Sequence, residues 1–128
     1  MLLRKYVSMF GVGSAKIDLV LPKTTFHPGE LLNGYFFLEG GIVKQKLRRI
    51  DCDLVMVDKY STEKTIDSTT ILKSEELQPD ETNKLNFVYR IPKTLQSDEK
   101  GIRYLFKTKL TFDKGVESLD EDWITVVS

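Results

Sequence analysis

Apolar and polar residues alternate along much of this chain, which is the period expected of half-buried β-strands. The longest alternating run covers residues 102–112, and Leu105 alone interrupts its polar face. Further strands are predicted, from alternation or from β-favouring side chains, over residues 16–21, 34–38, 50–57, 85–89 and 123–127. Residues 62–77 are polar and rich in threonine, so we expect them to form an exposed strand at a sheet edge.

Proline-containing turns separate the predicted strands. Pro28-Gly29 favours a type II turn, because glycine accepts the positive φ that this turn needs after the proline. Pro79-Asp80 is expected to form a type I turn, because aspartate follows the proline. A change of face near Arg48 and Arg49 predicts a bulge or the start of a strand. Together these signals predict an all-β fold, an antiparallel immunoglobulin-like sandwich of about seven to eight strands.

The length of 128 residues suits one domain with its own core. We expect residues 15–128 to form the sandwich and residues 1–14 to form an N-terminal segment that packs on it. Apolar residues at helical spacing in this segment would also suit a basic amphipathic helix at a membrane surface. Packing is the favoured interpretation, since Arg4 and Lys5 are the only charged residues there.

Composition narrows the possible partners. The 19 basic and 19 acidic residues cancel, so no overall field favours nucleic acid or a membrane. The apolar start of the chain is interrupted by charge and is too short to span a bilayer. Cys52 is the only cysteine, which excludes an internal disulfide and favours a reducing, cytoplasmic location.

Candidate catalytic chemistry is sparse. His27, the only histidine, lies in the Pro28-Gly29 turn, while the alternation around Cys52 places that thiol on a buried face. A Cys–His nucleophile pair and a closed zinc site are therefore not expected. The acidic run 120–122 is expected in a solvated polar hairpin, and a calcium loop over 113–122 matches no known spacing. We predict no catalytic residue, no cofactor and no metal, and hence no enzyme.

Two features suit contact with a partner. The densest basic cluster would suit an acidic protein, an anionic lipid or a phosphorylated segment, and consists of Lys44, Lys46, Arg48 and Arg49. A solvated strand start is the simpler interpretation of the same cluster. Trp123 is flanked by acidic residues and is the aromatic side chain most worth testing for exposure.

Several segments together resemble the bacterial sporulation-control (SpoOM-like) family, whose members have an arrestin-like sandwich. The resemblance is carried by Gly11-Val12-Gly13-Ser14-Ala15-Lys16-Ile17-Asp18, by the Pro28-Gly29-Glu30, Gly34 and Gly40-Gly41 unit, by Ile91-Pro92, and by Leu119-Asp120-Glu121-Asp122-Trp123-Ile124-Thr125-Val126. It runs over nearly the whole chain. It implies a regulatory, non-enzymatic, intracellular role connected with sporulation or cell-envelope events. Members of the family usually continue into a second arrestin-like sandwich.

These observations predict an arrestin-like protein-interaction module. A partner strand could add to the edge at 62–77, a second copy could pair there as a homodimer, or an acidic surface could meet the basic cluster. The alternative is a sandwich that binds carbohydrate or lipid, and peripheral contact with a membrane stays open. Nucleic acid is not an expected partner.

Overall fold

The computed structural model describes residues 4–8, 14–97, 101–115 and 117–128. These residues form nine strands and no helix, in agreement with the predicted all-β fold. The strands are β1 (Arg4–Ser8), β2 (Lys16–Val20), β3 (Thr25–Phe26), β4 (Leu31–Glu39), β5 (Gln45–Val57), β6 (Glu63–Leu77), β7 (Thr82–Arg90), β8 (Arg103–Phe112) and β9 (Glu117–Val126). The described part of the chain has no helix long and apolar enough to cross a bilayer.

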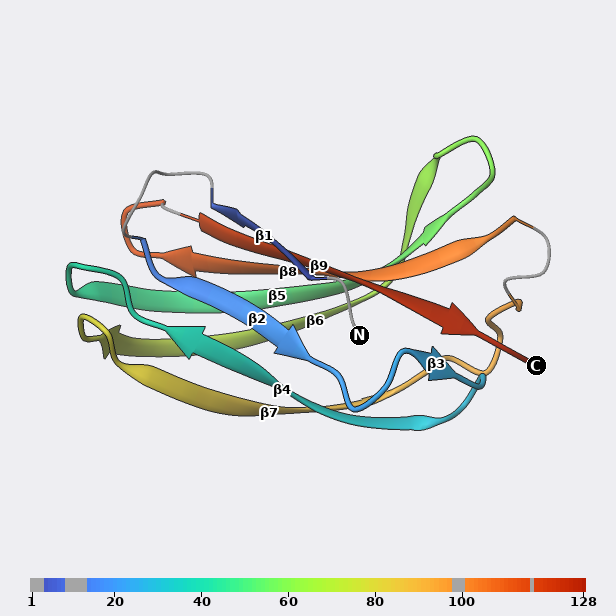
Figure 1. The fold of residues 1–128 in the computed structure, drawn as a ribbon, viewed down its shortest axis with the longest axis horizontal. Coiled ribbons are helices and arrows are strands. Elements are labelled where there is room, and N and C mark those ends of the chain that lie inside the picture. Colours follow the sequence, from blue (N-terminus) through green and yellow to red (C-terminus); the bar gives the residue numbers. More distant parts are fainter. Residues whose placement is uncertain (1–3, 9–13, 98–100, 116) are drawn as a thin grey trace.

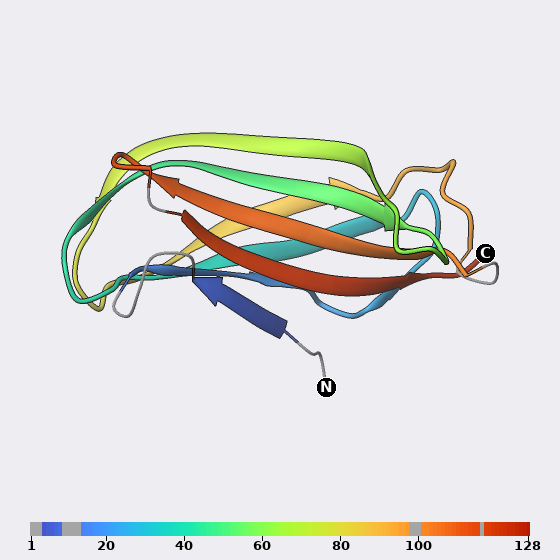
Figure 2. The ribbon, with the colours of Figure 1, turned by 90° about the horizontal axis from the view of Figure 1, so that it is seen from above.

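The strands form two sheets that face each other (Figures 1 and 2). The larger sheet has the order β1-β9-β8-β5-β6, and β3 adds to β9 as a short parallel strand. The smaller sheet has the order β2-β4-β7. All other pairs are antiparallel, so the predicted sandwich is confirmed, with β1 and β3 as short additions.

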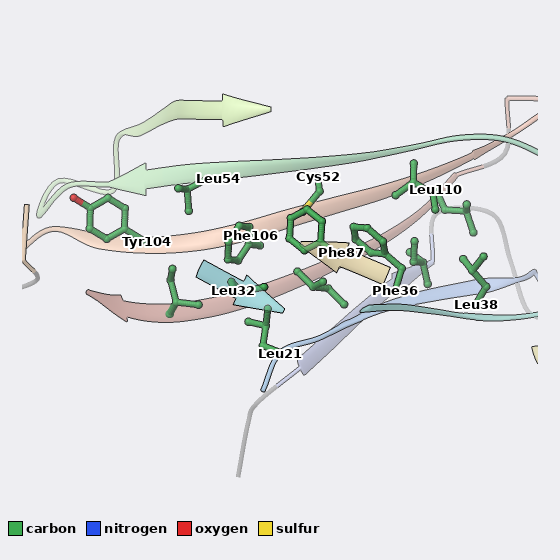
Figure 3. Close-up of a cluster of buried hydrophobic side chains, with 14 of the residues drawn as sticks. Leu21, Leu32, Phe36, Leu38, Cys52, Leu54, Phe87, Tyr104, Phe106 and Leu110 are labelled. Carbon is green, nitrogen blue, oxygen red and sulfur yellow. The ribbon is translucent and has the colours of Figure 1, made fainter. Parts of the chain in front are cut away.

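Apolar side chains from both sheets fill the space between them (Figure 3). Phe36 of β4, Phe87 of β7 and Phe106 of β8 meet at its centre, with Phe87 ring centroids 5.0 Å from Phe36 and 6.0 Å from Phe106. Aromatic pairs at such separations stabilise a core beyond the area that they bury. Cys52 lies on the same inner face and is buried, as the alternation in β5 predicted.

Both proline turns have a positive φ at the residue after the proline, as in a type II turn. The sequence predicted this type for the Pro28-Gly29 turn alone. Gly29 has φ +83° and Glu30 N donates to His27 O at 3.1 Å, which confirms the type II turn. This turn follows the two-residue strand β3, although β2 and β4 pair with each other as expected. Asp80 has φ +59° in its own turn, so the predicted type I turn is wrong. Aspartate tolerates the left-handed region because its short side chain is polar.

A close backbone contact holds two loops at one end of the sandwich. Gly40 follows the end of β4, and a Cβ at this position would lie 2.1 Å from the carbonyl oxygen of Gln78. Gly40 N donates to Glu81 O at 2.7 Å, and Asp80 N donates to Gly41 O at 3.1 Å. The glycine pair thus ends β4 where the loop after β6 must approach.

The N-terminal strand β1 pairs with β9, in a register from Arg4 opposite Asp122 to Ser8 opposite Ser118. Residues 4–8 therefore do not follow the helical spacing that the apolar residues suggested. The remainder of the expected N-terminal segment, apart from Ser14, lies outside the described residues.

The pairing of β5 with its neighbours has two register irregularities. One lies between Leu47 and Arg49, where the sequence predicted a bulge, and the other between Leu54 and Val55 of the β5–β6 pair. Beyond the second, the β5–β6 hairpin bends away from the smaller sheet (Figure 1). Alternation places Leu105 on the outer face of the larger sheet, where it forms a second, small apolar cluster with Val55 and Val57.

Candidate partner-binding surfaces

The edge of the larger sheet is open along β6. This strand has 15 residues and pairs with β5 alone among the described strands. From residue 69 to 76 its side chains alternate between half-buried and exposed, and Leu72 on the exposed side is 78% accessible. The strand predicted at 62–77 is thus an edge strand, with backbone donors and acceptors on its unpaired side.

The edge of the smaller sheet lies beneath it. The hydroxyl of Tyr89 on β7 donates to Asp67 of β6 at 2.7 Å, and the amide of Asn83 donates to Glu75 at 3.0 Å. Burial, and then the hydrogen bond to Asp67, raise the pKa of the Tyr89 hydroxyl. Strand β7 pairs with β4 alone among the described strands, so both sheets end on the same side of the sandwich.

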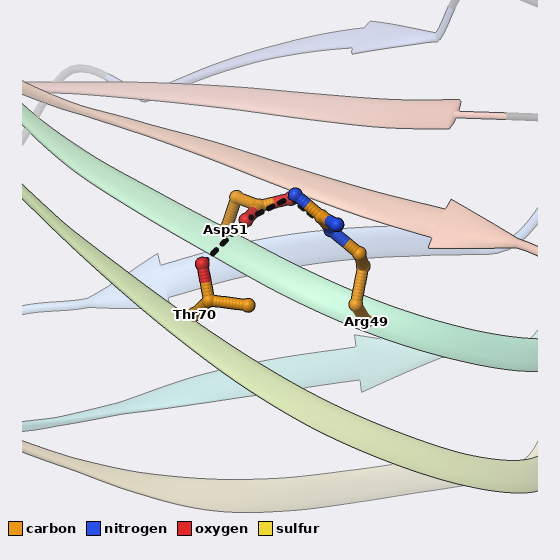
Figure 4. Close-up of polar contacts among 3 residues, drawn as sticks. All are labelled: Arg49, Asp51 and Thr70. Carbon is orange, nitrogen blue, oxygen red and sulfur yellow. Dashed lines mark hydrogen bonds and ion pairs between the residues drawn. The ribbon is translucent and has the colours of Figure 1, made fainter.

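The four residues of the predicted basic cluster do not lie together on one surface. Arg49 lies on the outer face, where its guanidinium donates to both carboxylate oxygens of Asp51 at 2.8 and 3.0 Å. Thr70 of β6 donates to the same carboxylate at 2.8 Å (Figure 4). Burial acts to raise the pKa of Asp51, but these hydrogen bonds hold it below its usual value. Asp51 therefore links β5 to β6 through Thr70 and matches the charge of Arg49.

The other three basic residues lie at the end of the sandwich where β4 meets β5. Lys44 and Lys46 line a cavity of about 380 Å³. Arg48 lies beside it and pairs with Asp113, at 3.3 Å. Lys114, which the sequence analysis missed, also lines the cavity, because the turn after β8 brings it there. Gly115 N donates to Phe112 O at 3.0 Å in this turn, and Asp113 N donates to Lys46 O at 3.0 Å.

Trp123 is not a free aromatic surface. It is half-buried on the outer face of β9 and packs against the small cluster of Val55, Val57 and Leu105. The guanidinium carbon of Arg103 lies 4.0 Å from its ring centroid, which is a cation–π arrangement. These contacts occupy much of the indole, so its main part in the fold is to cover the outer apolar cluster.

The acidic run 120–122 differs most from its prediction. It lies within β9 rather than in a solvated hairpin, and Asp120 and Asp122 have no accessible surface. Asp18 of β2 faces them, and one carboxylate oxygen from each of the three residues lies within 4.8 Å of the others. Alternation along β9 turns these two residues inward, so position in the strand overrides their polarity.

This acidic cluster also links the two sheets. Asp120 Oδ2 accepts a hydrogen bond from Leu19 N at 2.8 Å, and Ser118 Oγ accepts one from Ile17 N at 3.4 Å. Asp18 and Asp122 also take part in hydrogen-bonding or electrostatic interactions, so neither is without a partner. The geometry is compatible with oxygen ligation of a cation, but the hydrogen bond to Leu19 already gives Asp120 a structural partner. We therefore interpret the cluster as an interior polar contact between β2 and β9.

The two residues considered for nucleophilic catalysis lie in different environments. Burial raises the pKa of the Cys52 thiol to about 12, and Thr108 donates to its sulfur at 3.5 Å. His27 is exposed, and its Nδ1 lies 3.1 Å from the carbonyl oxygen of Val127. A thiol held protonated inside the core is a poor nucleophile.

Known proteins share both the sequence and the fold. The profile of the family described as SpoOM protein matches residues 3–128. The sporulation-control protein spo0M of Bacillus subtilis (strain 168) is 28% identical over 130 residues, which cover 96% of this chain and 50% of that protein. The crystal structure of Spo0M, sporulation control protein, from Bacillus subtilis superposes on this chain with a TM-score of 0.82 and 27% sequence identity. The match covers 91% of this chain and 51% of that chain.

A more distant match shows the fold alone. A Niemann-Pick type C2 protein from the Japanese carpenter ant superposes with a TM-score of 0.62 at 8% identity, over 96% of this chain and 99% of that chain. The chain described here spans about half the length of the curated relative that it matches.

Proposed function

Because the chain belongs to the SpoOM protein family, we propose that it is a non-enzymatic regulatory protein of sporulation control that acts as an arrestin-like interaction module. The similarity to spo0M of Bacillus subtilis supports the regulatory role. A cytoplasmic location is part of this proposal and agrees with a single cysteine that stays reduced in the core.

The open edge of β6 is the observation that carries the proposal. A strand with one neighbour leaves every second backbone N–H and C=O without a ladder partner, and a peptide can add there by the hydrogen bonds of an antiparallel or parallel pair. Its length of 15 residues exceeds that of most strands and offers a long contact. Lys64 and Lys73 are of the type that keeps such an edge soluble until a suitable partner pairs with it.

A second copy of the chain is another candidate occupant of the same edge. Antiparallel pairing of β6 with itself about Thr70 would place Lys64 opposite Glu76, and Asp67 opposite Lys73. Opposite charges directly across a strand pair stabilise it modestly. A lipid-binding role has less support, because the rings of Phe36, Phe87 and Phe106 fill the space between the sheets.

Proline substitution tests the role of this edge. The N–H groups of adjacent residues in a strand point alternately to the paired and the open side, so one of Ser68→Pro and Thr69→Pro leaves the pairing with β5 intact. Ser68 N donates to the Asp67 carboxylate at 3.0 Å, so Ser68→Pro also removes this local contact. The proline variant that keeps the thermal midpoint is used as bait in crosslinked capture from lysate of the source bacterium. We expect partners of the unaltered chain to be lost.

The matched alanine variant, Ser68→Ala or Thr69→Ala, keeps the N–H and is expected to keep those partners. Sedimentation of the purified chain separates self-association from a foreign partner. Retention of all partners by the folded proline variant would contradict docking at β6.

A further inference from the structure

The cavity at the end of the sandwich has the features of a second contact site. We propose that it binds an acidic peptide segment of the partner, with one apolar side chain of that segment entering the cavity between Lys46 and Lys114. This inference rests on the proposed function, since it assigns a peptide partner to an interaction module. The site is formed by the turns after β4 and β8 together with the start of β5, and Glu76 near the end of β6 also lines it.

The charges of the cavity do not cancel. Lys44 pairs with Glu76 at 3.4 Å, and Arg48 pairs with Asp113 at 3.3 Å, so each acidic residue in the cavity wall already has a basic partner. Lys46 and Lys114 have no acidic partner within ion-pair distance among the described residues. Two ammonium groups that form no ion pair among the described residues therefore remain at the cavity, and they favour an anionic ligand.

The cavity also has an apolar lining that a simple anion does not need. Phe112 is buried and contributes to the wall, and Val43 lines the cavity with 58% of its surface accessible. Its neighbour Ile42 is 73% accessible. Two consecutive exposed aliphatic residues beside a concave surface are typical of a contact site rather than of a solvated loop.

The scaffold holds this site in one shape. Asp113 N donates to Lys46 O at 3.0 Å and ties the turn after β8 to the start of β5. Ala15 N donates to the side chain of Gln45 at 2.9 Å on the other side. A preformed site needs little ordering when a ligand binds, which lowers the entropic cost of association.

A peptide fits these features better than a membrane does. The lysines surround a concave site, which a single side chain can enter and the broad surface of a bilayer cannot. A peptide side chain can enter a cavity of about 380 Å³, which lies in the range of small-ligand sites. Carboxylates on either side of that side chain would then reach the two ammonium groups.

Fluorescence anisotropy with labelled synthetic peptides tests the proposal. The probe is a decapeptide of glutamate and aspartate with one central leucine, compared with the same peptide carrying serine in place of leucine and with a lysine-rich peptide. We expect saturable binding of the acidic leucine peptide, binding weakened about tenfold or more by Lys46→Glu with Lys114→Glu, and a smaller loss for Val43→Ser.

The control variant, Lys59→Glu with Lys93→Glu, changes the net charge equally at exposed lysines outside the cavity, and we expect it to bind as the unaltered chain does. Equal weakening by both double variants, or no binding of the acidic peptide, would overturn the proposal. So would preferential binding to phosphatidylglycerol vesicles. None of these results would affect the capture experiment with the β6 proline variants, so a failure here is distinguishable from a failure of the proposed function.

Discussion

The charged residues of β9 and those at the end of the sandwich lie in opposite environments, although the sequence presents both as short charged clusters. Asp120 and Asp122 alternate inward and are buried between the sheets, where Asp120 accepts a backbone hydrogen bond. Lys46 lies at the start of β5 and Lys114 in the turn after β8, and both side chains line a cavity at the end of the sandwich. The place of a charged residue relative to the two sheets, rather than local composition, thus decides whether it is buried between them or stays at the surface.

Substitution of the buried Asp120 should lower the stability of the fold more than any other change considered below. Asp120→Ala removes the acceptor of Leu19 N and leaves a buried N–H without a partner, so we expect the free energy of unfolding to fall by about 2 kcal/mol. Asp120→Asn keeps an acceptor and removes one of three neighbouring carboxylates, so its loss should be smaller. Urea denaturation measures both. An alanine variant as stable as the unaltered chain would show that this contact is not structural.

A smaller effect is expected where the two open edges meet. Tyr89→Phe removes the hydrogen bond to Asp67 and should lower the free energy of unfolding by about 1 kcal/mol. Because the pKa of Tyr89 is raised in the folded state, the folded chain holds this proton more tightly than the unfolded chain does. Its contribution is therefore complete below pH 10.0 and declines as the pH rises above that value.

Denaturation at neutral pH and above pH 10.0 checks this assignment. Tyr89→Phe should lose less stability between the two conditions than the unaltered chain does. Identical losses for the two proteins would show that Tyr89 ionises as freely in the folded chain as in the unfolded one.

The reaction rate of the Cys52 thiol measures the access of solvent and reagents to the space between the sheets. Its thiol is buried with a pKa of about 12, so we expect almost no reaction with Ellman's reagent in the folded chain at neutral pH and rapid reaction in urea. The same raised pKa makes this group, like Tyr89, a source of lost stability above its ordinary value of 9.0. Rapid labelling without denaturant would contradict the packed interior.

Substitutions of the two lysines at the cavity should have the smallest effect on stability. Lys46→Glu with Lys114→Glu should change the free energy of unfolding by no more than about 0.5 kcal/mol, because surface charges without partners contribute little to folding. The thermal midpoint of this double variant, beside that of Lys59→Glu with Lys93→Glu, gives the check. A large loss would mean that the two lysines support the fold, and the contrast with β9 would fail.

Alternation predicted the parts of the fold that depend on one face being buried. It placed Cys52 inward and the strand at 102–112, and it located the bulge near Arg49, whereas the edge at 62–77 was predicted from its polar composition. It also marked Leu105 as an interruption, and the structure explains this by an outer apolar cluster.

The sequence predictions failed where contacts between residues far apart in the chain determine the local structure. The acidic run 120–122 was assigned to a solvated hairpin because its composition is polar, although extending the period of 123–127 backwards would have turned residues 120 and 122 inward. Asp80 adopts a positive φ where its loop meets Gly41. Lys114 joins Lys46 only because β8 lies beside β5, a pairing that no local pattern reveals.

Amide hydrogen exchange of the chain bound to its captured partner shows whether that partner docks on β6. We expect slower exchange in peptides covering residues 63–77, relative to the free chain, because a docked strand gives the outward N–H groups of β6 new acceptors. Peptides from β8, which is paired on both sides, should exchange equally in both states. Unchanged exchange over 63–77, with protection confined to other surfaces, would contradict docking at this edge.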